Sequence, residues 1–435
     1  MPRPPASPDV RRARWALLVQ FALFGLVMTS WMTRLPSVTE ALGLSAADLG
    51  RLLFLGGLGT LVGAFTVGAV VARFGSRRTL AAGTAGNVVG FGLLALSVAT
   101  ASPDLFAAGT AVNGVCAAFV NVPINLNAAA VERRLGRAVL PQFHATFSLG
   151  AAAGALVAAG FAAAGLGVGI QLVIVTFAVT GLRAWLLGPS TSLTTPGHPA
   201  ATASVQAVPA SGRRPFSSAF GAWLEPHTLL LGVVLLAGSL TEGSANTWLS
   251  LALVEGFDQA ESVGAVAYGT FVVAMTALRL LGTGLIDRFG RVAVLRASGV
   301  SALAGLLLFV FAPAVGAAWI GIVLWGAGAA LTSPIALAAA SDEPVRAGQR
   351  MSVVTSFSTI AAITAPPLLG VLADAVGLRH ALLAIGVFVV LSLVMAGQVR
   401  RPADAPRPAP TARPAPAPAG VEAPAAPRAD ALADA

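Results

Sequence analysis

Several side chains that can carry charge lie deep inside long apolar runs of this sequence. Glu242 is the deepest carboxylate, Asn246 follows one helical turn later, and Arg279 lies in the next run. A poorly solvated carboxylate exchanges between protonated and charged forms, so Glu242 is a candidate proton carrier. The alternative is a structural ion pair between Glu242 and Arg279. An unperturbed imidazole titrates near neutral pH, so His144 is the second candidate proton carrier. The alternative is that His144 only packs against its neighbours.

Three asparagines lie in the stretch NVPINLNAAAVERR, residues 121–134, which is otherwise apolar enough to lie in a membrane. At about 100° per residue, Asn113, Asn121 and Asn125 fall on one side of a helix, while Asn127 points elsewhere. A polar side chain inside a membrane usually faces protein or a watery cavity. We therefore expect Asn121 and Asn125 to hydrogen-bond a polar solute, or else to join their helix to a neighbour.

Aromatic side chains and the remaining polar ones complete a candidate solute site. Tyr268, the only tyrosine, shares nearly one helical face with Arg279. The candidate solute-binding residues are Asn121, Asn125, Asn246, Trp31, Trp248, Arg279 and Tyr268. The sequence contains no HExxH, no Cys/His metal spacing, no P-loop and no nucleophile elbow. We expect no catalytic residue, no cofactor and no metal site, and therefore no enzyme.

Membrane spans are the elements that must hold these side chains. The 435 residues are 56% hydrophobic and 10% charged, and the mean hydropathy is +0.82. This composition lacks the charged surface of a soluble protein, whereas runs of about 20 apolar residues cross a bilayer as helices. We expect an all-α membrane protein with twelve transmembrane helices. The predicted spans lie near 14–34, 47–71, 79–100, 105–130, 140–163, 168–187, 227–253, 263–285, 294–312, 316–340, 351–373 and 379–398.

The arginines give these spans an orientation. All 27 basic residues are arginine; only Arg34, Arg51 and Arg379 fall in external segments, Arg279 falls within a span, and the rest count as cytoplasmic. This bias follows the positive-inside rule and predicts an even number of spans with both termini in the cytoplasm. The net charge of +9 therefore reflects membrane orientation, and we expect no nucleic-acid partner.

The chain divides into two halves. Residues 188–226, rich in Ser, Thr, Pro and Ala, form a cytoplasmic central loop between six-helix halves at 14–187 and 227–398. Residues 1–13 form a cytoplasmic N-terminal tail. The Pro/Ala-rich residues 399–435 have few large apolar side chains, so we expect a disordered cytoplasmic tail.

Short repeats relate the two halves. PINLNAAAVE at 123–132 reappears as PIALAAASDE at 334–343, and ARFG at 72–75 matches DRFG at 287–290, at similar offsets and in the same order. Duplicated six-helix halves are typical of transporters that rock one half against the other around a central site.

The ARFG repeat lies in a motif that carries a family resemblance. GAVVARFGSRR at 68–78 resembles the cytoplasmic loop motif of the major facilitator superfamily, with Ala72 in place of the usual acid. The resemblance implies that this motif forms a cytoplasmic gate and that Asp287, in the second copy, does most to hold the gate closed. The alternative is that the motif is only a basic cytoplasmic turn. Gly68 is expected to permit close approach of two helices. The motif residues are Gly68, Arg73, Gly75, Arg77 and Arg78, and in the second copy Asp287, Arg288 and Gly290.

Further stretches narrow the resemblance. SWMTRLPS at 30–37, FHATFSLGAAAGA at 143–155 and TEG with its following Trp at 241–248 are similar to a poorly characterised branch of bacterial permeases near the fucose-permease-like proteins. The resemblance implies a major facilitator fold in two pseudo-symmetric halves. It also implies a monomer in the bacterial cell membrane that moves a small solute by alternating access, coupled to protons.

Two alternatives to this function stay open. One is a membrane-embedded sensor or scaffold built on a transporter fold, since fold does not dictate function. The other, within transport, is efflux of a drug or metabolite by proton antiport, in place of uptake of a small polar, sugar-like solute.

Overall fold

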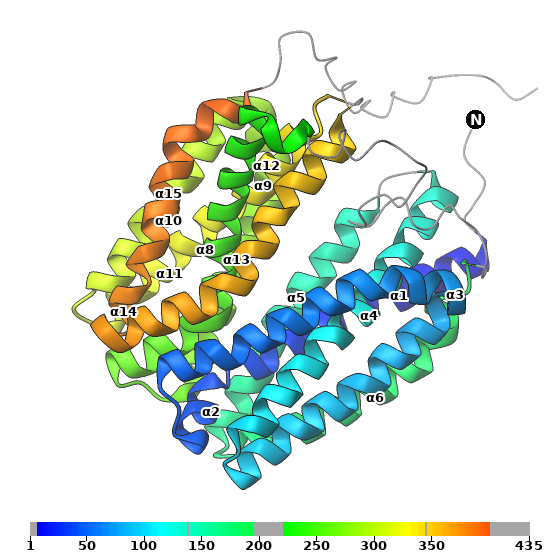
Figure 1. Cartoon of the computed structure of the whole chain (residues 1–435), viewed down its shortest axis with the longest axis horizontal. Helices are drawn as coiled ribbons and strands as arrows, with labels where there is room; N and C mark the ends of the chain where they lie inside the picture. Colours follow the sequence, from blue (N-terminus) through cyan, green and yellow to red (C-terminus); the bar gives the residue numbers. More distant parts are fainter. Residues whose placement is uncertain (1–6, 137–138, 195–220, 344–345, 401–435) are drawn as a thin grey trace, which may run out of the picture. The chain divides into compact units, whose positions relative to one another are not determined.

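Long helices make up the described part of the chain (Figure 1). The computed structural model describes residues 7–136, 139–194, 221–343 and 346–400. Within these ranges eleven helices are long and apolar enough to cross a membrane, and no strand occurs. The longest, α3 (Ala46–Thr100), is interrupted at Gly75 and contains two of the predicted spans. The prediction of an all-α membrane protein with twelve spans is therefore confirmed.

The helices fall into the two predicted halves. The first half holds α1 (Pro8–Met32), α2 (Leu35–Leu42), α3, α4 (Pro103–Leu135), α5 (Leu140–Ala163) and α6 (Val168–Ser190). The second holds η2 (Ala222–Leu224), α8 (Pro226–Phe257), α9 (Glu261–Phe289), α10 (Arg291–Phe311), α11 (Val315–Ala329), α12 (Thr332–Ala340), α13 (Ala347–Val376), α14 (Leu378–Ala381), α15 (Leu383–Met395) and η3 (Ala396–Val399). In Figure 1 the blue-to-teal helices α1 to α6 lie together, as do the green-to-orange helices of the second half.

The two copies of the loop motif form the same backbone turn. Gly75 has φ 80° and ψ 162°, and Gly290, at the matching place in the second half, has φ 79° and ψ 157°. A side chain makes this region of backbone space unfavourable, so glycine is the residue that adopts it at little cost. The sequence repeat is thus a structural repeat.

Local capping fixes where helices start. Ser45 and Asp48 form a capping box at the start of α3, in which the Asp48 amide donates to the Ser45 hydroxyl at 3.2 Å. Glu132, in the repeated PINLNAAAVE segment, accepts from the amides of Val139 at 2.7 Å and Leu140 at 2.8 Å. A carboxylate satisfies the free amides at a helix start and interacts favourably with its dipole. The end of α4 is in this way tied to the start of α5.

Glycines bring α3 and α4 together, but not at the predicted position. A Cβ on Gly59 or Gly63 would collide with the backbone of α4. A Cβ on Gly68 would meet no atom of the described part of the chain within 4 Å. The expectation that Gly68 permits close helix approach is therefore wrong in this conformation, since the close contacts lie five and nine residues earlier in the same helix.

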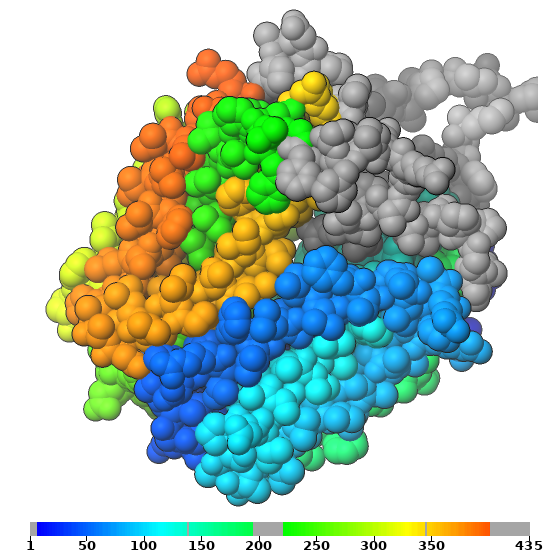
Figure 2. Space-filling view, viewed as in Figure 1, coloured from blue at the N-terminus to red at the C-terminus, as the bar shows by residue number. Residues whose placement is uncertain are grey.

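The two halves pack against each other through α3 and α13. A Cβ on Gly50 would lie 2.5 Å from the carbonyl oxygen of Pro366 and 2.9 Å from the Cα of Pro367. Gly370 likewise faces the backbone of Ala46. Figure 2 shows the blue surface of α3 lying against the orange surface of α13. Two small residues, one from each half, therefore permit backbone contact at this end of the helices.

Some sequence predictions fall beyond the described residues. The central loop predicted at 188–226 is described only at its two ends, because 195–220 lies outside the described ranges. The tail predicted at 399–435 is described only as far as residue 400. The predictions for these segments stay predictions.

Candidate functional site

A cavity of about 450 Å³ lies between the two halves. Its wall comes from α1, α3, α4 and α6 of the first half and from α8 and α13 of the second. Small-molecule sites typically span about 300 to 1,000 Å³ and are mostly apolar with a few polar groups. The residues that line it include the aromatic residues Phe24, Trp31, Phe91 and Trp248. The cavity therefore has the size and composition of a site for a small solute.

Four of the residues predicted from sequence line this cavity. Glu242 and Asn246 lie one turn apart on α8, on the same wall. Trp248 is fully buried, and its indole Nε1–H has no hydrogen-bond partner in the structure. Trp31 is 6% exposed and makes edge contacts with two phenylalanines, at centroid distances of 6.5 Å each. The structure thus brings Trp31, Glu242, Asn246 and Trp248 to one place.

Glu242 is ion-paired with Arg279. The Arg279 Nη2 donates to the Glu242 Oε2 at 2.7 Å, and both side chains are about one third exposed, at 30% and 37%. The Arg279 Nε donates to the carbonyl oxygen of Ala330 at 3.0 Å, where α11 ends before α12. Arg279 therefore joins a carboxylate of the cavity wall to a helix break, although Arg279 itself is not part of the lining.

Asn121 and Asn125 lie outside the lining of this cavity. The Asn125 Nδ2 donates to the side-chain oxygen of Asn121 at 2.8 Å and to its backbone oxygen at 2.9 Å. On the same side of α4, Asn113 does line the cavity. Asn127, which was expected to point elsewhere, is buried and donates to the Pro123 carbonyl at 2.8 Å. Binding of solute by Asn121 and Asn125 stays a prediction.

His144 and Tyr268 also lie outside the lining. His144 is exposed on α5, and its ring meets Phe21 edge-on at 5.5 Å. Tyr268 is 6% exposed, stacks on Phe271 at 6.1 Å and is positioned by packing. Their predicted roles in proton coupling and solute binding stay predictions.

Arg183 is the charged residue of the cavity that sequence reasoning missed. The arginine count placed it with the cytoplasmic residues, which is wrong, because it lies well inside α6, is 2% exposed and lines the cavity. Its Nη1 donates to the Asn87 Oδ1 at 3.4 Å, and the Asn87 Nδ2 donates to the Asn113 Oδ1 at 2.9 Å. An arginine about two turns before the end of an apolar run is the signal that could have found it.

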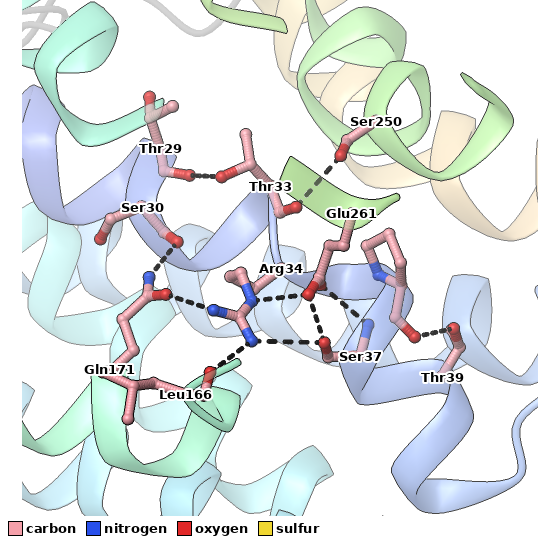
Figure 3. Close-up of polar contacts among 11 residues, drawn as sticks. Thr29, Ser30, Thr33, Arg34, Ser37, Thr39, Leu166, Gln171, Ser250 and Glu261 are labelled. Carbon is pink, nitrogen blue, oxygen red and sulfur yellow. Dashed lines mark hydrogen bonds and ion pairs between the residues drawn. The ribbon is translucent and has the colours of Figure 1, made fainter. Parts of the chain in front are cut away.

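At one end of the helices, Arg34 ties the two halves together (Figure 3). Its Nε lies 2.9 Å from the Glu261 Oε2, with the side chains 3% and 15% exposed. The Arg34 guanidinium also donates to the Gln171 side chain and to the Leu166 carbonyl, each at 2.9 Å. The Ser37 amide donates to the other oxygen of Glu261 at 3.0 Å, and its hydroxyl donates to the carboxylate as well. The carboxylate of the second half is thus held by several groups of the first.

Two further contacts join the halves at this end. Asp374 of α13 accepts from the amides of Ala46 at 3.0 Å and Ala47 at 3.3 Å, at the N-terminus of α3. The Ser250 hydroxyl of α8 donates to the Thr33 carbonyl at 3.1 Å. This is the end that the arginine distribution predicts to be external.

The loop motifs lie at the other end of the helices. Arg73 and Arg288 each place the guanidinium over the following phenylalanine, at 5.3 and 5.2 Å. Asp287 is exposed and makes no ion pair among the described residues. Arg291 pairs with Asp342 at 2.6 Å inside the second half. No ion pair between described residues joins the two halves at this end, and the latch role of Asp287 stays a prediction.

A second cluster at this end holds the start of α8. Glu225 accepts hydrogen bonds from Thr228, Arg346 and Arg350, each at 2.8 Å. Partial burial raises the pKa of Glu225, but hydrogen bonds from Thr228, Arg350 and Arg346 and the charge of Arg350 outweigh it. The pKa of this carboxyl therefore lies below its ordinary value. The cluster ties α8 to the start of α13.

A family pattern matches most of this chain. The sequence pattern described as Major Facilitator Superfamily matches residues 16–349. The chain belongs to the Major Facilitator Superfamily. The uncharacterized transporter y4wD of Sinorhizobium fredii is 33% identical over 379 residues, which cover 86% of this major facilitator chain and 95% of the relative. The membrane protein MosC of Rhizobium meliloti is 27% identical over 404 residues, covering 92% and 94%.

Solved major facilitator structures share the fold. The nucleoside transporter NupG is similar with a TM-score of 0.66 and 15% identity, covering 90% of this chain and 98% of the other. A variant of the E. coli fucose:proton symporter FucP is similar with a TM-score of 0.59 and 16% identity, covering 89% and 99%. The resemblance inferred from the loop motif is confirmed. This major facilitator protein is a multi-pass membrane protein and a secondary transporter.

Proposed function

We propose that this protein moves a small solute through the cavity between its halves by alternating access, driven by protons that bind Glu242. The observation that carries the proposal is the Glu242–Arg279 ion pair on the cavity wall, at 2.7 Å and partly exposed. A proton on Glu242 removes the charge that holds Arg279 and frees the link between α8 and the break after α11. Protonation and helix movement are coupled in this way.

The contacts between the halves support a conformation open toward the cytoplasm. The Arg34–Glu261 pair and the Asp374 contacts close the end predicted to be external. The arginine-rich end, which carries Arg73 and Arg288, has no ion pair between the halves among the described residues. The positive-inside rule assigns the arginine-rich end to the cytoplasm of the bacterial cell, with both termini on that side.

Purified protein in proteoliposomes tests the coupling role. A thermal-stability screen across sugars, amino acids, organic anions and drug-like cations selects the labelled solute. Glu242→Gln should bind this solute and exchange it across the membrane, but should lose the accumulation driven by a pH gradient. If Glu242 only neutralises Arg279, Glu242→Gln leaves a charge without its partner and lowers the folded yield, and Arg279→Gln restores part of it. Full pH-driven accumulation in folded Glu242→Gln would exclude Glu242 and leave His144 as the next candidate.

The same proteoliposome experiment distinguishes transport from a sensor or scaffold, and uptake from efflux. A sensor or scaffold on this fold gives no solute accumulation at all. Uptake by symport and efflux by antiport differ in the sign of the pH gradient that drives accumulation. FucP, a fucose:proton symporter with a similar fold, supports proton coupling in this protein.

A further inference from the structure

The cavity wall holds a buried guanidinium without a counter-charge. Arg183 is 2% exposed and lines the cavity, and within the described ranges its Nε and Nη2 have no hydrogen-bond partner. It makes no ion pair with any described residue, and the hydrogen bond that its side chain makes is the long one to Asn87 at 3.4 Å. An ion taken out of water costs several kcal/mol unless it is paired, and arginine does not lose its proton to escape that cost.

The other unpartnered groups on this wall are also hydrogen-bond donors. They are the Asn113 Nδ2, the Ser244 hydroxyl and the Trp248 Nε1–H, each buried and each belonging to a residue of the cavity lining. Asn113 is fixed by Asn87, which donates to its oxygen and leaves its Nδ2 free. Among the described residues, the side-chain atoms of this cavity wall that lack a hydrogen-bond partner can therefore all be satisfied by the acceptor oxygens of a ligand.

The charges of the cavity wall also favour a ligand that is negatively charged. Among the residues that line the cavity, the ionised side chains are Arg183 and Glu242. Glu242 is neutralised by Arg279 at 2.7 Å, so the positive charge of Arg183 is left unbalanced. One guanidinium balances one negative charge, and its planar fork matches a carboxylate. A phosphate group at neutral pH carries closer to two charges.

We propose that the solute of this cavity is a small organic monocarboxylate, bound through its carboxylate by Arg183 and Asn113. This assignment rests on the proposed transport function and names its substrate class. Phe91 lies one turn beyond Asn87 on α3, and the ring of Trp31 lies 6.5 Å from it. The apolar body of the solute packs against these two rings, next to the donors that hold its charge.

Thermal unfolding of the purified full-length protein tests this with matched probes. Benzoate carries the proposed carboxylate, benzamide has the same shape without charge, benzylamine carries the opposite charge, and inorganic phosphate is an anion without an apolar body. Benzoate should raise the unfolding temperature, and the other three should not. Isothermal titration should show benzoate binding at least tenfold more tightly than benzamide.

Variants assign the effect to the named residues. Arg183→Gln should abolish the shift with benzoate, while the ligand-free variant unfolds at the same temperature or higher, because an unpaired buried charge is gone. Arg133→Gln, at the exposed end of α4, should keep the full shift. If Arg183→Gln does not fold, Asn113→Leu serves as the second variant and should weaken benzoate binding while the charge remains.

Each outcome decides between the proposals. An equal shift from benzamide or from phosphate overturns the monocarboxylate assignment, and so does a benzoate shift that survives in Arg183→Gln. Benzoate binding without accumulation in proteoliposomes would overturn the transport function and leave the anion site standing. Accumulation of a neutral solute without carboxylate binding would overturn the anion site alone.

Discussion

The ion pair between Arg34 and Glu261 should set the balance between the two conformations of this transporter. Glu261 belongs to the second half, and its carboxylate contacts Arg34 at 2.9 Å and the Ser37 amide at 3.0 Å, both in the first half. Rocking the halves apart at this end breaks these contacts. A contact that forms in one of the two states and not in the other shifts the equilibrium between them by the full free energy of that contact. Glu261→Gln should therefore favour the state open at this end.

The size of the shift follows from what the substitution leaves behind. A hydrogen bond to a charged group is worth about 1.5 to 3 kcal/mol. A glutamine keeps one acceptor for Ser37, and Arg34 keeps its contacts to Gln171 and to the Leu166 carbonyl. The net loss is about 2 kcal/mol, which corresponds to a shift of about 30-fold in the equilibrium constant.

A cysteine at Ser250 reports this opening. Ser250 is 4% exposed, and its hydroxyl donates across the halves to the Thr33 carbonyl. The native cysteine, Cys116, is first replaced by alanine in every variant. A membrane-impermeant maleimide added from the external side should label Ser250→Cys about 30-fold faster when Glu261→Gln is present, because the rate follows the population of the open state.

The control is an ion pair at the same end that stays inside one helix. Arg51 pairs with Asp48 at 3.0 Å, with side chains 67% and 46% exposed. Exposed pairs contribute little, and this one does not join the halves. Arg51→Gln should leave the labelling rate unchanged. An unchanged rate in folded Glu261→Gln would refute the view that this pair holds the end closed.

Three further predictions concern packing, pH and the motif end. Gly59→Ala should lose about 1 to 3 kcal/mol of stability because its methyl group meets the α4 backbone. Gly68→Ala should lose no stability, and equal unfolding temperatures of the two variants would contradict this prediction. Glu225 has a lowered pKa, so its stabilisation is present near neutrality and lost as the pH falls below the ordinary value of 4.5. The difference in unfolding temperature between wild type and Glu225→Gln should therefore vanish in acid, and a constant difference would count against it. Asp287→Asn should favour opening at the cytoplasmic end, measured as faster labelling of Asn121→Cys from that side.

The sequence alone determined the membrane architecture of this protein. A bilayer requires apolar runs of a minimum length and helices that satisfy their own backbone, and both requirements can be read without knowing the neighbours of a helix. The same holds for the turns at Gly75 and Gly290, where the backbone conformation itself demands glycine. The pairing of Glu242 with Arg279 could be named as an alternative, because few charges lie deep in spans and each needs a partner.

Only the tertiary structure decided which polar side chains share the cavity. Helical spacing places Asn113, Asn121 and Asn125 on one side of α4, but of these three only Asn113 lines the cavity. Asn121 and Asn125 bond to each other outside it. The sequence assigned Arg183 to the cytoplasmic arginines, whereas the packing of α6 buries it beside Asn87. Periodicity fixes a face relative to the helix axis, whereas the neighbour of that face depends on contacts far apart in the chain.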